Sequence, residues 1–170
     1  MPTIRKSPGA TTAPATKTQD AVQLLMADHA EVKPLFKQYE QLVEDEADDE
    51  DKQELAEQIC DLLTVHATIE EEIFYPAAKE ALEEPDLVDE ATVEHASAKD
   101  LIAQIQEGSP ADELYDAKVK VLGEYIEHHV KEEETEMFAM AKKSNMDLRA
   151  LGLQMITRKQ DLMDELGGTN

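Results

Sequence analysis

Four histidines and two glutamates recur at helical spacing along this chain of 170 residues. Two of these histidines each have a glutamate four residues later, in the pattern His-x-x-x-Glu, and the other two histidines each follow an acidic residue. The six residues are His29, His66, Glu70, His95, His129 and Glu133. Residues four apart lie on one face of an α-helix, so each His-x-x-x-Glu directs an imidazole and a carboxylate the same way. Imidazole and carboxylate together are suitable ligands for iron, zinc, manganese or copper.

An internal repeat relates the six residues. The segment "DHAEVK" at 28–33 matches "EHASAK" at 94–99, and "HATIEEEIFYPAAK" at 66–79 matches "HVKEEETEMFAMAK" at 129–142. The alignment pairs His29 with His95, His66 with His129, and Glu70 with Glu133. Each half is predicted to be a helical hairpin, and a pseudo-twofold axis between the halves would bring equal donors to one site.

The elements that must position these residues are all helical in period. Apolar residues three and four apart predict helices over 20–43, from 51 into the eighties, from "EEPD" to "GSP", and from Pro110 to Lys143. A fifth amphipathic segment covers 146–166. Short links between them predict an all-α, antiparallel up-down four-helix bundle with an additional C-terminal helix. Pro34 and Pro76 are expected to bend their helices.

The chain is predicted to divide into three parts. Residues 1–19 have the Pro, Thr and Ala content of a disordered tail. The bundle occupies 20–143, and 144–170 form a C-terminal amphipathic helix with a short tail. That helix is expected to pack outside the bundle or against a partner, which leaves a monomer or a homodimer open.

The six candidate residues are predicted to lie in one layer of the bundle. In an antiparallel hairpin, residues equally distant from the turn are level, and the six are nearly equidistant from the links that join their helices. Burying two carboxylates and four imidazoles is costly without partners. A buried layer of this kind therefore predicts metal, and two carboxylates that can bridge indicate two ions.

The donor count leaves room for a small ligand. Two histidines, one oxygen from each glutamate and a shared oxo or hydroxo group give each ion five donors. Octahedral iron then keeps one open position for a diatomic molecule or peroxide.

The neighbouring polar residues are interpreted as structural. Four glutamates are expected on a solvated face: Glu71, Glu72, Glu132 and Glu134. His128 is turned about 100° from His129 and is expected to be partly exposed. Tyr125 lies one turn before His129 on the same side. It is expected in ordinary packing, and the alternatives are a contact with a ligand or donation of an oxygen to the metal. Cys60, as a single cysteine, excludes an intramolecular disulfide and is typical of a reducing cytoplasm.

The net charge of −23 argues against two classes of partner. Such a surface repels phosphate backbones and anionic lipids, so neither nucleic acid nor a membrane is expected. No apolar run approaches the roughly 20 residues of a transmembrane helix.

The ordered motif set resembles hemerythrin-like proteins, specifically the HHE cation-binding domain family. It is carried by "DH" at 28–29, "HATIEEEIFYP" at 66–76, "EH" at 94–95 and "HHVKEEETEMF" at 128–138, and covers about residues 20–143. The resemblance implies a non-haem di-iron centre, oxo- or hydroxo-bridged, in a four-helix bundle. The four histidines would be terminal ligands and the two glutamates would bridge; zinc or manganese are alternative metals.

The sequence departs from the oxygen-carrying hemerythrins. Those have five histidines, with His-x-x-x-His on the third helix, whereas Lys99 stands four residues after His95 here. Their last ligand pair is His-x-x-x-x-Asp. His129 with Glu133 is the better match here, while His128 with Glu133 and His129 with Glu134 stay open. One histidine fewer favours redox reactivity over reversible oxygen carriage.

The resemblance is closer to di-iron proteins implicated in iron–sulfur repair and nitric-oxide stress. We therefore expect a protein that binds or reduces oxygen, nitric oxide or peroxide, with an undetermined electron donor. Oxidoreductase or peroxidase-like turnover is left open. The alternatives are iron sensing, storage or delivery without turnover, and a structural metal-binding bundle.

Overall fold

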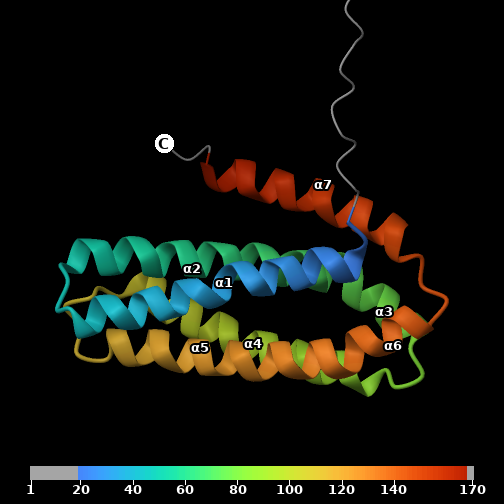
Figure 1. Ribbon diagram of the computed structural model, residues 1–170, viewed down its shortest axis with the longest axis horizontal. Helices are drawn as coiled ribbons and strands as arrows, with labels where there is room; N and C mark the ends of the chain where they lie inside the picture. Colours follow the sequence, from blue (N-terminus) through green and yellow to red (C-terminus); the bar gives the residue numbers. More distant parts are fainter. Residues whose placement is uncertain (1–18, 168–170) are drawn as a thin grey trace, which may run out of the picture.

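The computed structural model describes residues 19–167. Within that range the chain is helical and contains no strand, and four helical rods form a bundle with a fifth helix beside it (Figure 1). The predicted all-α four-helix fold is confirmed. The predicted N-terminal tail lies almost entirely outside the described residues.

Two of the four rods are interrupted by a short π-helical turn. The elements are α1 (Ala21–Glu44), α2 (Asp49–Ile69), η1 (Glu70–Phe74), α3 (Tyr75–Ala81), α4 (Asp86–Glu107), α5 (Tyr115–Glu132), η2 (Glu133–Met137), α6 (Phe138–Lys143) and α7 (Leu148–Gly167). α2, η1 and α3 form one rod, and α5, η2 and α6 form another. α1 and α4 each contact both α2 and α5, so α1 and α4 stand diagonally across the bundle.

The start of the first rod and the start of the fourth rod are each set by local hydrogen bonds. Asp20 caps α1, since its carboxylate accepts from the Gln23 backbone N–H and the Gln23 side chain accepts from the Asp20 N–H. The prediction that the fourth helix begins at Pro110 is wrong. The Ser109 N–H donates to Asp112 at 2.8 Å, which stabilises a turn there, and α5 begins only at Tyr115.

The two π-helical turns occupy equivalent places in the repeat. η1 begins at Glu70 and η2 begins at Glu133. The expected distortion at Pro76 coincides with η1, but Ala139 holds the equivalent position after η2 and can form a normal hydrogen bond. Proline is therefore not the common cause. π-turns inside α-helices are frequent at functional sites, and here each starts at a buried glutamate.

The core consists of two apolar clusters on either side of the histidine layer. Toward the α3 and α6 end, the larger side chains are Leu25, Ile69, Phe74, Met137, Phe138 and Met155. Toward the opposite end, they are Val32, Tyr39, Ile59, Leu63, Ile102, Ile105, Tyr115 and Leu122. Cys60 is buried in the second cluster, and burial raises the pKa of its thiol to about 12.

α7 packs on the outside of the bundle against α1 and α2, which is one of the two arrangements that the sequence left open (Figure 1). Met155 is fully buried at this contact. Gly152 lies so close to the chain entering α1 that a Cβ there would stand 2.6 Å from the Gln19 carbonyl oxygen. Among residues 19–167, no helix has the length and apolar character to span a membrane.

Gly152 gives a test of how tightly α7 is packed. Gly152→Ala is expected to lower the free energy of unfolding by about 1–3 kcal/mol, because the added methyl meets backbone that no rotamer change can move. Gly167→Ala is the control, since a Cβ at that glycine meets nothing within 4 Å. Urea unfolding of both variants measures the difference, and equal stability would contradict the close approach.

Candidate metal centre

The structure brings all six predicted residues together in one buried layer. They form two groups that share both glutamates: His29, His66, Glu70 and Glu133, and Glu70, His95, His129 and Glu133. Within each group, one donor atom per residue lies within 4.8 Å of the others. Each of the four rods contributes one histidine, and the two rods with π-turns also contribute a glutamate.

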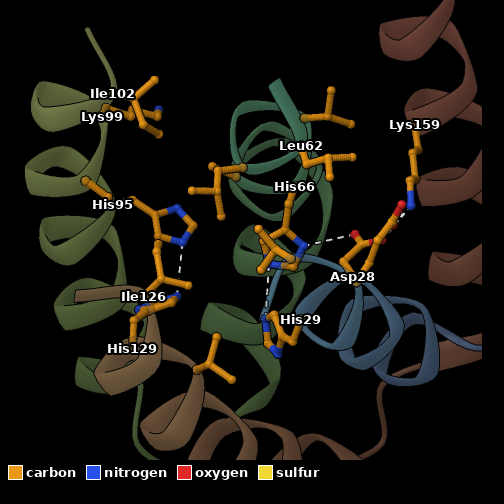
Figure 2. Close-up of a pocket in the computed structure, with 17 residues that line it drawn as sticks. Asp28, His29, Leu62, His66, His95, Lys99, Ile102, Ile126, His129 and Lys159 are labelled. Atoms are coloured by element: carbon orange, nitrogen blue, oxygen red, sulfur yellow. Dashed lines mark hydrogen bonds and ion pairs between the residues drawn. The ribbon is translucent and has the colours of Figure 1, made fainter. Parts of the chain in front are cut away.

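The distances within each group suit a shared ion. The Nε2 atoms of His29 and His66 lie 3.1 Å apart, and those of His95 and His129 lie 3.2 Å apart (Figure 2). Two donors at right angles, each about 2.1 Å from one metal ion, are about 3.0 Å from one another. Each histidine pair therefore has the separation of neighbouring ligands of one ion.

The glutamates connect the two groups. The Oε1 atom of Glu133 lies 3.3 Å from His29 Nε2, and its Oε2 atom lies 3.2 Å from His129 Nε2. One carboxylate thus faces both histidine pairs, which is the arrangement of a bridging ligand. Glu70 contacts His66 Nε2 through Oε1 and is fully buried.

A second ring of carboxylates fixes the orientation of the four imidazoles. The Nδ1 atom of each histidine contacts one carboxylate: His29 contacts Glu134 at 3.0 Å, His66 contacts Asp28 at 2.9 Å, His95 contacts Glu71 at 3.3 Å, and His129 contacts Glu94 at 3.4 Å. A carboxylate only accepts hydrogen bonds, so each Nδ1 carries the proton. The Nε2 lone pairs consequently point inward, as in carboxylate–histidine–metal arrangements.

Two members of this ring correct the sequence analysis. Glu71 and Glu134 were expected on a solvated face, but their side chains are only 28% and 31% exposed and contact histidines of the other half. Each directly follows a glutamate of the inner layer. The side chains of Glu72 and Glu132 are 48% and 45% exposed, as predicted. Each carboxylate of this ring directly precedes or follows an inner-layer residue in the sequence: Asp28 precedes His29, Glu94 precedes His95, Glu71 follows Glu70 and Glu134 follows Glu133. This adjacency was a signal in the sequence that apolar periodicity does not identify.

The inner layer lacks positive charge. Both oxygens of Glu70 and the Oε1 atom of Glu133 are buried without a hydrogen-bond partner. When the imidazoles are neutral, their four inward Nε2 lone pairs face these oxygens, so lone pairs converge on one space. Such an arrangement needs positive charge, which metal ions or protons can supply. Two histidine pairs bridged by two carboxylates fit two ions of iron, zinc or manganese.

In the metal-free chain, protons on the histidines supply the positive charge that metal ions would otherwise bring to the inner layer. Burial opposes ionisation of His66, but Glu70 and Asp28 together raise its pKa to about 10. Burial likewise opposes ionisation of His129, and Glu133 raises its pKa to about 9. The pKa of Glu133 is held well below its usual range, because His129 and His29 outweigh the effect of burial. Metal binding must therefore displace protons from these imidazoles.

Tyr75 is a site residue that the sequence analysis missed. Its hydroxyl donates to Glu133 Oε2 at 2.5 Å and lies 3.1 Å from His95 Nε2 and 3.4 Å from His129 Nε2. Burial and the charges of Glu70 and Glu133 raise the pKa of this phenol. The repeat aligns Tyr75 with Phe138, whose ring stacks on His29 at 5.9 Å and brings no hydroxyl. The two groups are therefore chemically different.

The geometry decides between the alternative pairs of candidate ligands that the sequence left open in the fourth rod. The His128 side chain is 65% exposed and pairs with Glu132, while Glu134 faces His29 from outside the layer. Of these four residues of the fourth rod, only His129 and Glu133 direct donor atoms into the inner layer. Tyr125 is 46% exposed, so its predicted packing role is wrong.

An apolar cavity of about 40 Å³ adjoins the inner layer. All four candidate histidines contribute to its wall (Figure 2). Its remaining lining includes Val32, Leu62, Leu63, Ala98, Ile102 and Ile126, with Lys99 and Lys159 also present.

The bridging role of the glutamates can be tested by metal content. Glu70→Gln and Glu133→Gln keep the side-chain volume but remove a charge shared by both groups, so each is expected to reduce the metal from two ions to one or fewer per chain. Elemental analysis of purified protein measures this. Glu72→Gln, on the same π-turn but exposed, is the control. Full occupancy in either inner variant would show that the bridging assignment is wrong.

The hydroxyl of Tyr75 is expected to stabilise the metal-free protein. Tyr75→Phe removes the donor to a buried carboxylate and should lower the free energy of unfolding by about 1–3 kcal/mol. A smaller loss is expected with zinc bound, since the ion then satisfies Glu133. Denaturant unfolding with and without zinc measures both values, with Tyr125→Phe as the exposed control. An equal loss in both states would contradict this role.

Comparison with known proteins agrees with the geometry. A curated relative, described as a DNA nickase from Nostoc sp., is 30% identical over 152 residues, which cover 88% of this chain but only 41% of the relative. The chain thus spans less than half the length of that relative. A solved structure, a hemerythrin HHE cation binding domain-containing protein from Mycobacterium kansasii described as an Rv2633c homolog, shares the fold. Its TM-score is 0.69 at 23% identity, with 85% of this chain and 87% of the other covered.

The family assignment rests on the match over the bundle itself. The family model of the hemerythrin HHE cation binding domain matches residues 20–141, which include all six candidate ligands and the second ring of carboxylates. The chain belongs to the hemerythrin HHE cation-binding domain family and is a metal-binding protein of that type.

Proposed function

We propose that this chain is a di-iron protein that binds or reduces a small neutral oxidant, namely oxygen, nitric oxide or hydrogen peroxide. The observation that carries the proposal is the apolar cavity against both histidine pairs. The six inner-layer residues would hold the two iron ions. When bound, such an iron pair supplies one or two electrons to a small oxidant.

The cavity favours small, uncharged molecules. A single water needs about 10–15 Å³ of comparable space, so a cavity of about 40 Å³ admits only very small molecules. Moving an anion past apolar side chains such as Leu63 and Ile102 has a large desolvation cost. The net charge of −23 adds to the barrier for anions.

The residues of the chain hold and shield the site. The second ring of carboxylates keeps each imidazole in the tautomer that presents Nε2 to a metal. The two apolar clusters exclude bulk water on both sides of the layer. The hydroxyl of Tyr75 lies within hydrogen-bonding distance of the inner layer and donates its proton to Glu133. Electrons would come from a separate donor.

We further propose a cytoplasmic role in oxidative or nitrosative stress, without nucleic acid as a partner. The nicking activity of the Nostoc relative is not extended to this chain, since the match covers 41% of that protein. An acidic surface also repels DNA. Iron delivery or a structural zinc role remain the competing functions.

Reaction with oxidants tests the proposal directly. An iron-loaded, anaerobically reduced sample is expected to change its near-ultraviolet and visible spectrum on exposure to oxygen, nitric oxide or hydrogen peroxide. Ala98→Leu narrows the cavity and is expected to slow this change, whereas the exposed Ala96→Leu on the same helix is not. The absence of any spectral response to all three molecules would refute the proposal. Zinc as the only metal after expression in iron-replete medium would favour the structural alternative.

A further inference from the structure

α7 reaches the metal layer although it lies outside the four-helix bundle. The Nζ atom of Lys159 on α7 donates to Asp28 Oδ1 at 2.5 Å. The other oxygen of Asp28 accepts from His66 Nδ1 at 2.9 Å, and His66 Nε2 faces the inner layer (Figure 2). Three side chains from three helices thus connect the outer helix to a candidate ligand.

This connection is well shielded from water. The side chain of Asp28 is 10% exposed and that of Lys159 is 23% exposed. Lys159 also contributes to the wall of the cavity beside the histidines. The ammonium group therefore lies where a charge–charge contact is stronger than on an open surface.

The other histidine pair has its own lysine, and that lysine belongs to the bundle. Lys99 on α4 donates to Glu71 at 2.5 Å, and Glu71 accepts from His95 Nδ1. Among residues 19–167, no lysine or arginine pairs with Glu94 or Glu134, which face the two remaining histidines. In each histidine pair, one histidine thus has a carboxylate partner that is itself paired with a lysine. Of these two lysines, only Lys159 comes from α7.

α7 is also anchored independently of Lys159. Arg158 forms two hydrogen bonds with Glu72 on η1, at 2.8 and 3.3 Å. Met155 is fully buried, and Gly152 packs against the backbone before α1. Removing the Lys159 ammonium group should therefore leave α7 docked.

We propose that Lys159 is a positioning residue of the metal centre, through which α7 controls how firmly the position between His29 and His66 retains its ion. The position between His95 and His129 depends on Lys99 instead of Lys159. This inference rests on the metal-binding part of the proposed function and not on any reaction with oxidants.

The physical reason is the freedom of a buried carboxylate. Without Lys159, Asp28 keeps only the hydrogen bond from His66 and can rotate toward water. The imidazole then loses the partner that fixes its tautomer and orientation. Removing such an outer partner lowers metal affinity about 10–100-fold in other sites.

The experiment measures zinc release from the full chain. Protein loaded with two zinc ions is mixed with an excess of a coloured chelator, and the release of each ion is followed. In Lys159→Met, which keeps the apolar stem, one of the two ions is expected to leave at least about tenfold faster. Lys159→Arg retains a charged donor and is expected to restore most of the retention.

Two comparison variants identify the position and the mechanism. Lys99→Met is expected to accelerate the release of the other ion, so the double variant should lose both ions quickly. Arg158→Met removes an α7 anchor without touching Asp28 and is expected to release both ions at the parent rate. Far-ultraviolet circular dichroism and thermal unfolding of the metal-free variants check that the helices are intact.

The outcomes separate this inference from the proposed function. Unchanged release in Lys159→Met overturns it, as does equal acceleration of both ions or the same acceleration in Arg158→Met. Zinc undergoes no redox change, so failure of the iron-loaded protein to react with oxidants would leave this result standing. A chain that binds no metal at all would refute both.

Discussion

The convergence of acceptor atoms in one buried layer is the constraint on which the rest of the structure depends. Two carboxylates and four imidazole lone pairs point into the same space, and three carboxylate oxygens there have no hydrogen-bond partner. Protons raise the charge of the layer in the metal-free chain, through the elevated pKa values of His66 and His129. The division of the core into two apolar clusters, the paired π-turns and the outer carboxylates all accommodate this layer.

The twofold relation between the halves is close but is broken in two places with chemical consequences. Tyr75 places a hydroxyl among the donors of one group, whereas its counterpart Phe138 stacks on His29 in the other. α7 has no counterpart in the repeat, and its Lys159 contacts Asp28, the carboxylate partner of His66. The two histidine pairs therefore differ: one has a tyrosine hydroxyl among its neighbours, and the other has a lysine of α7 behind one of its carboxylate partners.

Much of this arrangement follows from spacing alone. Apolar periodicity predicted the four rods, and positions four apart predicted that His66 with Glu70, and His129 with Glu133, would share a helix face. The missed features depend on contacts between helices. Glu71 and Glu134 reach histidines of the opposite half, so nothing in their own helix distinguished them from a solvated face. The late start of α5 results from a turn at Ser109.

The sequence by itself determined the fold class, the family and the six candidate ligands, because helical period and donor type are local properties. The tertiary structure decided which carboxylate serves which imidazole, since those pairs join residues between 24 and 105 positions apart. It also decided that Tyr75 rather than Tyr125 lies at the site, and that Lys159 reaches Asp28. These depend on how helices pack against one another, and helix packing is set by side-chain volume and close approach, as at Gly152, rather than by spacing along one helix.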